Sequence, residues 1–135
     1  MFDFNTMKDI PDKKRGLARI VAAFFYSLSG LRSAFVNEAA FRQELLLFFV
    51  LLPILFFLPI SGYLKSLLLI VNTMVLIVEL LNSGIEAVVD MAAPEYHSLA
   101  KRAKDMGSAA VLISLVLAAI LWVYAFVKAM SGHGV

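Results

Sequence analysis

The feature that most constrains this chain is a long apolar run that leads into a short cluster of polar side chains. Residues 64–78 are interrupted only by Lys65, Ser66, Asn72 and Thr73. A helix of this composition is apolar on nearly all sides, so hydrocarbon or other protein must surround it. The run therefore predicts a helix that lies within a membrane.

The polar cluster at the end of this run consists of Glu79, Asn82, Glu86 and Asp90. At about 100° per residue, these side chains fall within an arc of roughly 80° and form one polar stripe on a helix. If Lys65 marks one membrane face, Glu79 lies about 21 Å further along, near the opposite interface of a hydrocarbon core ~30 Å thick. A lipid hydroxyl could meet a carboxylate at that depth. Alternatively, the stripe only holds neighbouring helices together by hydrogen bonds.

The composition also favours a membrane protein. Of the 135 residues, 61% are hydrophobic and only 16% are charged, which lies outside the usual range of soluble domains. The absence of cysteine excludes disulfides, a thiolate nucleophile and cysteine-ligated metal sites. A formal net charge of +2 is too small to indicate nucleic-acid binding. We therefore expect an all-α membrane protein.

The predicted organisation is a single domain with an N-terminal amphipathic interfacial helix and three transmembrane helices. In the interfacial helix, Phe24, Leu28, Leu31 and Phe35 recur at helical spacing among cationic groups, which suits a helix lying in the interface plane. The predicted segments are a polar leader (1–16), the interfacial helix (17–44), a first span (45–62), a second span (64–92), a polar connection (93–106), a third span (107–128) and a tail (129–135).

The distribution of Lys and Arg predicts the orientation. Seven lie in the leader and interfacial helix and three in the polar connection, against Lys65 and Lys128 at the other ends of the spans. Because cationic residues favour the cytoplasmic side, we expect the N-terminus and the polar connection in the cytoplasm and the C-terminus outside. Lys101 and Arg102 could equally attract anionic lipid or bind phosphate.

Polar groups gather at the predicted cytoplasmic interface. Hard oxygen ligands, a positioned lysine and a candidate base are what phosphoryl transfer needs, since that reaction depends on positioning and on neutralising charge around Mg²⁺ and a nucleotide. The signatures of soluble nucleotide-binding enzymes, Gly-x-x-x-x-Gly-Lys-Ser/Thr and His-Arg-Asp, are missing. A kinase built on this chain must therefore use a site formed by helices. The polar groups are Glu38, Glu44, Glu79, Asn82, Glu86, Asp90, Glu95, His97, Lys104 and Asp105.

Several of these groups also have a purely structural interpretation. Glu38 and Arg42, four residues apart, could form an ordinary surface ion pair. Asp105 could cap the N-terminus of the third span. His97 taken alone is typical of an exposed loop histidine.

Four separated motifs resemble those of the prokaryotic diacylglycerol kinase family, which are small trimeric integral membrane enzymes. The resemblance runs from about Arg19 to Trp122, in the family's order and at compatible spacings. It implies a homotrimeric helical bundle in the bacterial inner membrane, with active sites at the interfaces between subunits. The motifs are residues 37–44 (NEAAFRQE), 78–90 (VELLNSGIEAVVD), 95–97 (EYH) and 103–111 (AKDMGSAAV).

The resemblance also implies transfer of the γ-phosphate of ATP to 1,2-diacylglycerol, with Mg²⁺ as cofactor and phosphatidic acid as product. Glu79 would be the general base that takes the hydroxyl proton, and Asn82 would lie beside the reacting groups. Glu38 and Glu86 would hold the metal ion. The residues implied to bind the nucleotide are Tyr26, Glu38, Glu86, Glu95, Tyr96, His97, Lys104 and Asp105. Those implied to line the lipid-substrate side are Arg19, Arg32, Glu44, Glu79 and Ser108.

Two other functions stay open at this point. An undecaprenol kinase of the same superfamily would share the catalytic residues and differ only in the slot for the lipid chain. A non-enzymatic membrane assembly or transport subunit would use the acidic stripe to bind or conduct ions. Such a subunit would show no lipid-dependent consumption of ATP.

Overall fold

A computed structural model describes residues 16–132, and within that range every element is an α-helix. All four helices are long and apolar enough to cross a membrane, judged by length and composition. The predicted all-α membrane fold is confirmed, and the chain is a multi-pass membrane protein. Most of the predicted leader and the last three residues of the tail lie outside the described residues. The helices are α1 (Leu17–Asn37), α2 (Ala39–Phe57), α3 (Gly62–Ala92) and α4 (Ser98–Met130).

The chain divides after Arg32 into two compact units. The part of α1 in the first unit exposes large apolar side chains, including Ile20, Phe24 and Phe25, and the rings of Phe24 and Phe25 meet edge to face with centroids 5.9 Å apart. α1 is also the least apolar of the four helices. Its location in the interface plane stays a prediction.

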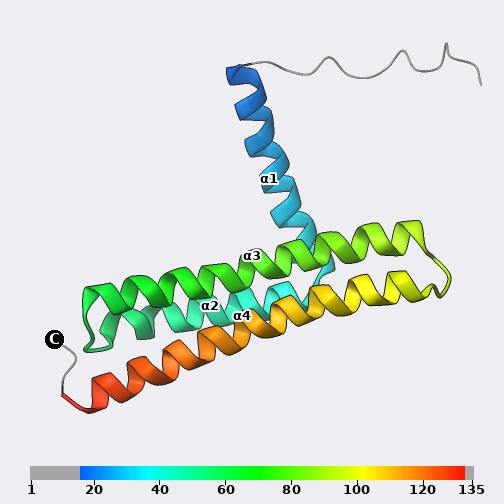
Figure 1. Cartoon of the computed structure of the whole chain (residues 1–135). Helices are drawn as coiled ribbons and strands as arrows, with labels where there is room; N and C mark the ends of the chain where they lie inside the picture. Colours follow the sequence, from blue (N-terminus) through cyan, green and yellow to red (C-terminus); the bar gives the residue numbers. More distant parts are fainter. Residues whose placement is uncertain (1–15, 133–135) are drawn as a thin grey trace, which may run out of the picture. The chain divides into compact units, whose positions relative to one another are not determined.

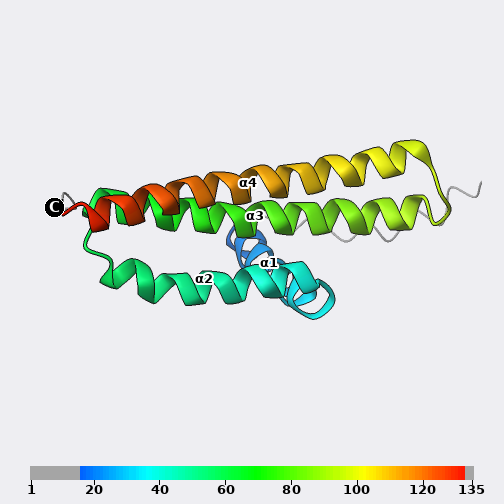
Figure 2. The ribbon, with the colours of Figure 1, turned by 90° about the horizontal axis from the view of Figure 1, so that it is seen from below.

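The second unit is a bundle in which α3 is the middle helix. α3 runs antiparallel to α4 and also packs against α2, whereas the backbones of α2 and α4 do not approach each other closely (Figures 1 and 2). Leu68 is fully buried and packs with Trp122 and Ala125 of α4. Further along α3, Val71 packs near Ala118. Small residues on α4 at these positions allow the two helices to lie close together.

The ends of the helices have identifiable local causes. The Ser61 hydroxyl caps α3 by accepting a hydrogen bond from the Leu64 N–H at 3.3 Å. His97 caps α4 in the same way, since its Nδ1 accepts from the Leu99 N–H at 3.2 Å. Both caps satisfy N–H groups that a helix start leaves without a partner.

The break between α1 and α2 lies at Glu38, earlier than the change from interfacial helix to first span predicted at Leu45. Glu38 has an extended backbone with φ −105° and ψ 112°. Arg42 donates from Nη1 to the carbonyl oxygens of Phe35 and Val36 at 3.0 Å each. Its guanidinium therefore satisfies carbonyls at the end of α1, and no ion pair joins it to Glu38 within the described residues. The point at which the chain enters the membrane stays a prediction.

The predicted polar connection is largely helical, because α4 already begins at Ser98. Residues 98–106 are rich in Ala, Lys, Arg, Leu and Met, which favour a helix. Asp105 consequently lies within α4, where its Oδ2 pairs with Lys101 Nζ at 2.5 Å. The interpretation of Asp105 as a helix cap is therefore wrong, and His97 has that role.

Gly107 marks a close approach of α4 to α3. It is buried, and a Cβ added to it would overlap the side-chain Oδ1 of Asn82. Asn82 is itself only 8% exposed, and its Nδ2 donates to Glu86 Oε1 at 3.1 Å. The amide cannot move aside without losing that bond. By contrast, an added Cβ at Gly84 would meet nothing within 4 Å.

We expect Gly107→Ala to destabilise the bundle by about 1–3 kcal/mol, as overpacking of a tight contact usually does. Gly84→Ala is the matched control, and it should be neutral or stabilising by about 0.5–1 kcal/mol because Ala is the better helix former. Unfolding in mixed micelles of SDS and mild detergent, followed by circular dichroism, measures both effects. Equal stabilities of the two variants would contradict the close approach at Gly107.

Candidate active site

Glu79 is only 4% exposed although it is ionisable. Its carboxylate lies within electrostatic range of three others, those of Glu38, Glu44 and Glu86. Like charges repel strongly where water is largely excluded. The arrangement therefore favours protons or cations between these carboxylates.

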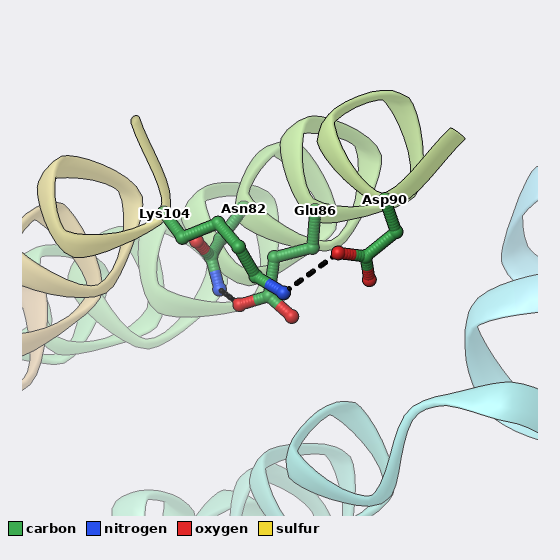
Figure 3. Close-up of polar contacts among 4 residues, drawn as sticks. All are labelled: Asn82, Glu86, Asp90 and Lys104. Carbon is green, nitrogen blue, oxygen red and sulfur yellow. Dashed lines mark hydrogen bonds and ion pairs between the residues drawn. The ribbon is translucent and has the colours of Figure 1, made fainter. Parts of the chain in front are cut away.

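The remainder of the polar stripe connects α3 to α4 (Figure 3). Asn82 Nδ2 donates to Glu86 Oε1 at 3.1 Å, and Lys104 Nζ donates to Asp90 Oδ1 at 2.9 Å. Figure 3 shows the Lys104 side chain reaching past Glu86 toward Asp90, and its ammonium also attracts Glu86. The side chains of Lys104 and Asp90 are 38% and 65% exposed, so this ion pair contributes little to stability. Lys104 can therefore exchange Asp90 for another anion.

An open pocket lies at the connection between α3 and α4 and has a volume of about 490 Å³. It brings together most of the residues predicted to bind a nucleotide. Lys104 and Lys101 supply positive charge, and the Tyr96 side chain is 85% exposed and offers an aromatic face. The role of the pocket stays a prediction. The predicted residues that line it are Glu95, Tyr96, His97, Lys104 and Asp105.

The remaining predicted site residues are not part of these contacts. Tyr26, Arg19 and Arg32 belong to the first unit, in which all three are exposed. Ser108 is exposed on α4, next to Gly107. Their contacts with substrates stay predictions.

A second, mostly apolar cavity of about 390 Å³ is lined by residues of α2, α3 and α4. Glu44 lines it, and the buried Oε2 of Glu44 has no hydrogen-bond partner among the described residues. Asn72 lines it as well, and its Oδ1 accepts a hydrogen bond from Trp122 Nε1 at 3.0 Å. The only sequence signal for this polar pair is the interruption of the apolar run by Asn72. No local pattern connects it to a residue fifty positions away.

Glu38 and Glu86 offer the carboxylate oxygens that Mg²⁺ prefers. Within residues 16–132, no group of three or more His, Cys, Asp or Glu side chains is arranged to hold a metal ion by itself. Mg²⁺ is usually bound by about one or two carboxylates together with substrate phosphates and water. The repelling carboxylates therefore fit a metal ion that arrives with a nucleotide.

Comparisons with known proteins identify the family of this chain. The family described as prokaryotic diacylglycerol kinase matches residues 25–126. The chain is 50% identical over 107 residues to a diacylglycerol kinase of Escherichia coli, which covers 79% of this chain and 88% of that protein. It is 50% identical over 107 residues to the Pseudomonas aeruginosa diacylglycerol kinase (79% and 87% covered) and 40% identical over 120 residues to that of Helicobacter pylori (84% and 89% covered). The chain thus belongs to the prokaryotic diacylglycerol kinase family.

Proposed function

We propose that this chain transfers the γ-phosphate of ATP to the free hydroxyl of 1,2-diacylglycerol and so makes phosphatidic acid. Family membership and relatives that are diacylglycerol kinases support this activity. The observation that carries the proposal is the buried carboxylate of Glu79, which follows the apolar run within α3. An ionisable group so placed is costly unless it has a function or a partner. In the proposed reaction, a lipid hydroxyl would meet this carboxylate from the membrane and a triphosphate would meet it from the water.

In this reaction Glu79 accepts the hydroxyl proton while the lipid oxygen attacks the γ-phosphorus. The new bond joins that oxygen to phosphorus, and the bond from phosphorus to the bridging oxygen of ADP breaks. ADP leaves with the electron pair of the broken bond. The positions of the reacting atoms and the stabilisation of charge supply most of the catalysis.

The other residues of the stripe position and neutralise the phosphates. Asn82 holds the Glu86 carboxylate through its 3.1 Å hydrogen bond, and Lys104 exchanges Asp90 for phosphate oxygens. Mg²⁺ held by Glu38 and Glu86 would neutralise charge on the phosphate oxygens when bound. The nucleotide would occupy the open pocket at the connection between α3 and α4.

The active chain would be a homotrimer with sites at the subunit interfaces. In a single copy the stripe is incompletely covered, since Glu86 is half-buried and Asp90 is exposed. Polar groups inside a membrane favour contact with another helix, and a second copy of the same chain can provide it. The excess of Lys and Arg supports a cytoplasmic N-terminus and α3–α4 connection, with the C-terminus outside.

We expect Glu79→Gln to lower kcat by about 10²–10⁴-fold, the usual contribution of a general base. The KM for ATP should change little, because Gln has the same size and lies away from the nucleotide pocket. Transfer of labelled γ-phosphate from ATP to diacylglycerol by purified protein in mixed micelles measures this effect. Circular dichroism of the variant serves as the folding control. Near-normal turnover by a folded Glu79→Gln protein would exclude Glu79 as the base.

We expect Glu86→Gln to raise the Mg²⁺ concentration required for half-maximal activity by at least about tenfold, since even residues that only support metal ligands typically contribute 10–100-fold to affinity. Activity removed by EDTA should return on addition of Mg²⁺. Asp90→Asn is the matched control on the same face of α3, and it should leave the Mg²⁺ requirement unchanged. An equal shift in both variants would indicate a general charge effect instead of metal binding.

The choice of lipid distinguishes the proposal from its alternatives. Purified protein should phosphorylate diacylglycerol in mixed micelles with a higher kcat/KM than undecaprenol, as expected from the relatives. A strong preference for undecaprenol would make the chain an undecaprenol kinase. The absence of any lipid-dependent ATP consumption would leave the non-enzymatic role.

A further inference from the structure

The apolar cavity between α2, α3 and α4 contains a hydrogen-bond donor of fixed direction. Asn72 lines the cavity and is 9% exposed. The Trp122 indole can only donate, so the atom that receives its 3.0 Å hydrogen bond must be the Asn72 oxygen. This contact fixes the orientation of the amide, and Nδ2 makes no hydrogen bond to another described residue.

A donor in these surroundings needs an acceptor. A polar group left unpaired in an apolar site costs about 1–3 kcal/mol, and the hydrocarbon of a lipid tail offers no acceptor. The remaining wall of the cavity is apolar apart from Glu44. A lipid that carries a carbonyl oxygen among apolar groups therefore complements the cavity better than a pure hydrocarbon chain does.

The position of Asn72 relative to Glu79 suits a glyceride. The two residues lie about two turns apart on nearly the same face of α3, a rise of roughly 10 Å. Both side chains lean toward the N-terminus of α3, and Glu is the longer, so their polar tips are closer than the backbone positions. In diacylglycerol the ester carbonyls follow the free hydroxyl after a few covalent bonds. With the hydroxyl at Glu79, the esters extend toward Asn72.

Glu44 connects the cavity with the candidate active site. It lines the cavity on the α2 side, and its carboxylate lies within electrostatic range of Glu79. The cavity therefore ends at a carboxylate that interacts electrostatically with the candidate base.

We propose that Asn72 is a specificity-determining residue for the lipid kinase reaction proposed above, and that its Nδ2 donates a hydrogen bond to an ester carbonyl of the substrate. Trp122 is the positioning residue that orients the amide. A lipid alcohol without an ester, such as an ether-linked dialkylglycerol, fills the same space and cannot make this bond.

The test compares kcat/KM for diacylglycerol with kcat/KM for a dialkylglycerol of equal chain length in mixed micelles. We expect the wild type to favour the ester by about 3- to 10-fold, the value of one hydrogen bond. Asn72→Leu should bring the ratio close to one by slowing turnover of the ester alone. Trp122→Phe should lower the ratio as well. Thr73→Val is the control, because Thr73 is exposed and its hydroxyl already bonds the Leu69 carbonyl at 2.8 Å; it should retain the wild-type ratio.

An unchanged ratio in Asn72→Leu overturns the proposal, and so does a wild type that uses both lipids equally. Either result leaves the lipid kinase function intact, whereas failure to phosphorylate any lipid removes both. If Asn72→Leu does not fold, Trp122→Phe decides, and an unchanged ratio there also overturns the proposal. A change of oligomeric state with the ratio retained would mean that another copy of the chain, not the substrate, fills the cavity.

Discussion

The burial of Glu79 inside an apolar bundle is the constraint on which the rest of this structure depends. An ionised carboxylate removed from water needs a compensating charge or a proton. Here its nearest charged neighbours include three further carboxylates. The repulsion among them costs local stability and at the same time creates an affinity for cations. A site of this kind suits a reaction in which a metal ion and a highly charged phosphate group arrive together.

Such a site requires a rigid frame, and the packing of α3 against α4 provides it. Ala118 and Ala125 of α4 allow close contact with α3 near Val71 and Leu68. Gly107 of α4 does the same next to Asn82. Because Gly107 has no side chain, there is space between the helices for the Asn82 amide. From this position Asn82 Nδ2 donates a hydrogen bond to Glu86 Oε1. The arrangement of the polar stripe thus depends on a missing side chain on the neighbouring helix. Where water is excluded, small residues and polar groups have to be placed together in this way.

The sequence is sufficient to predict the helical membrane fold and the polar stripe, because apolar runs and helical spacing are local properties. It does not indicate the break at Glu38, since the flanking residues favour a helix and the Arg42 contacts that satisfy the end of α1 span several residues. The sequence predicts a polar connection at 93–106 before the third span, whereas α4 begins at Ser98, because most residues of 98–106 are good helix formers. The hydrogen bond between Asn72 and Trp122 depends on how two helices pack, which no local pattern encodes.

The location of Trp122 has a further consequence. It is the sole tryptophan of the chain, and it lines the apolar cavity with its indole nitrogen bonded to Asn72. Indole fluorescence depends on the polarity and hydrogen bonding around the ring, and all tryptophan emission of the unmodified protein comes from this one location. The chain therefore contains an intrinsic optical reporter of what occupies the space between α2, α3 and α4.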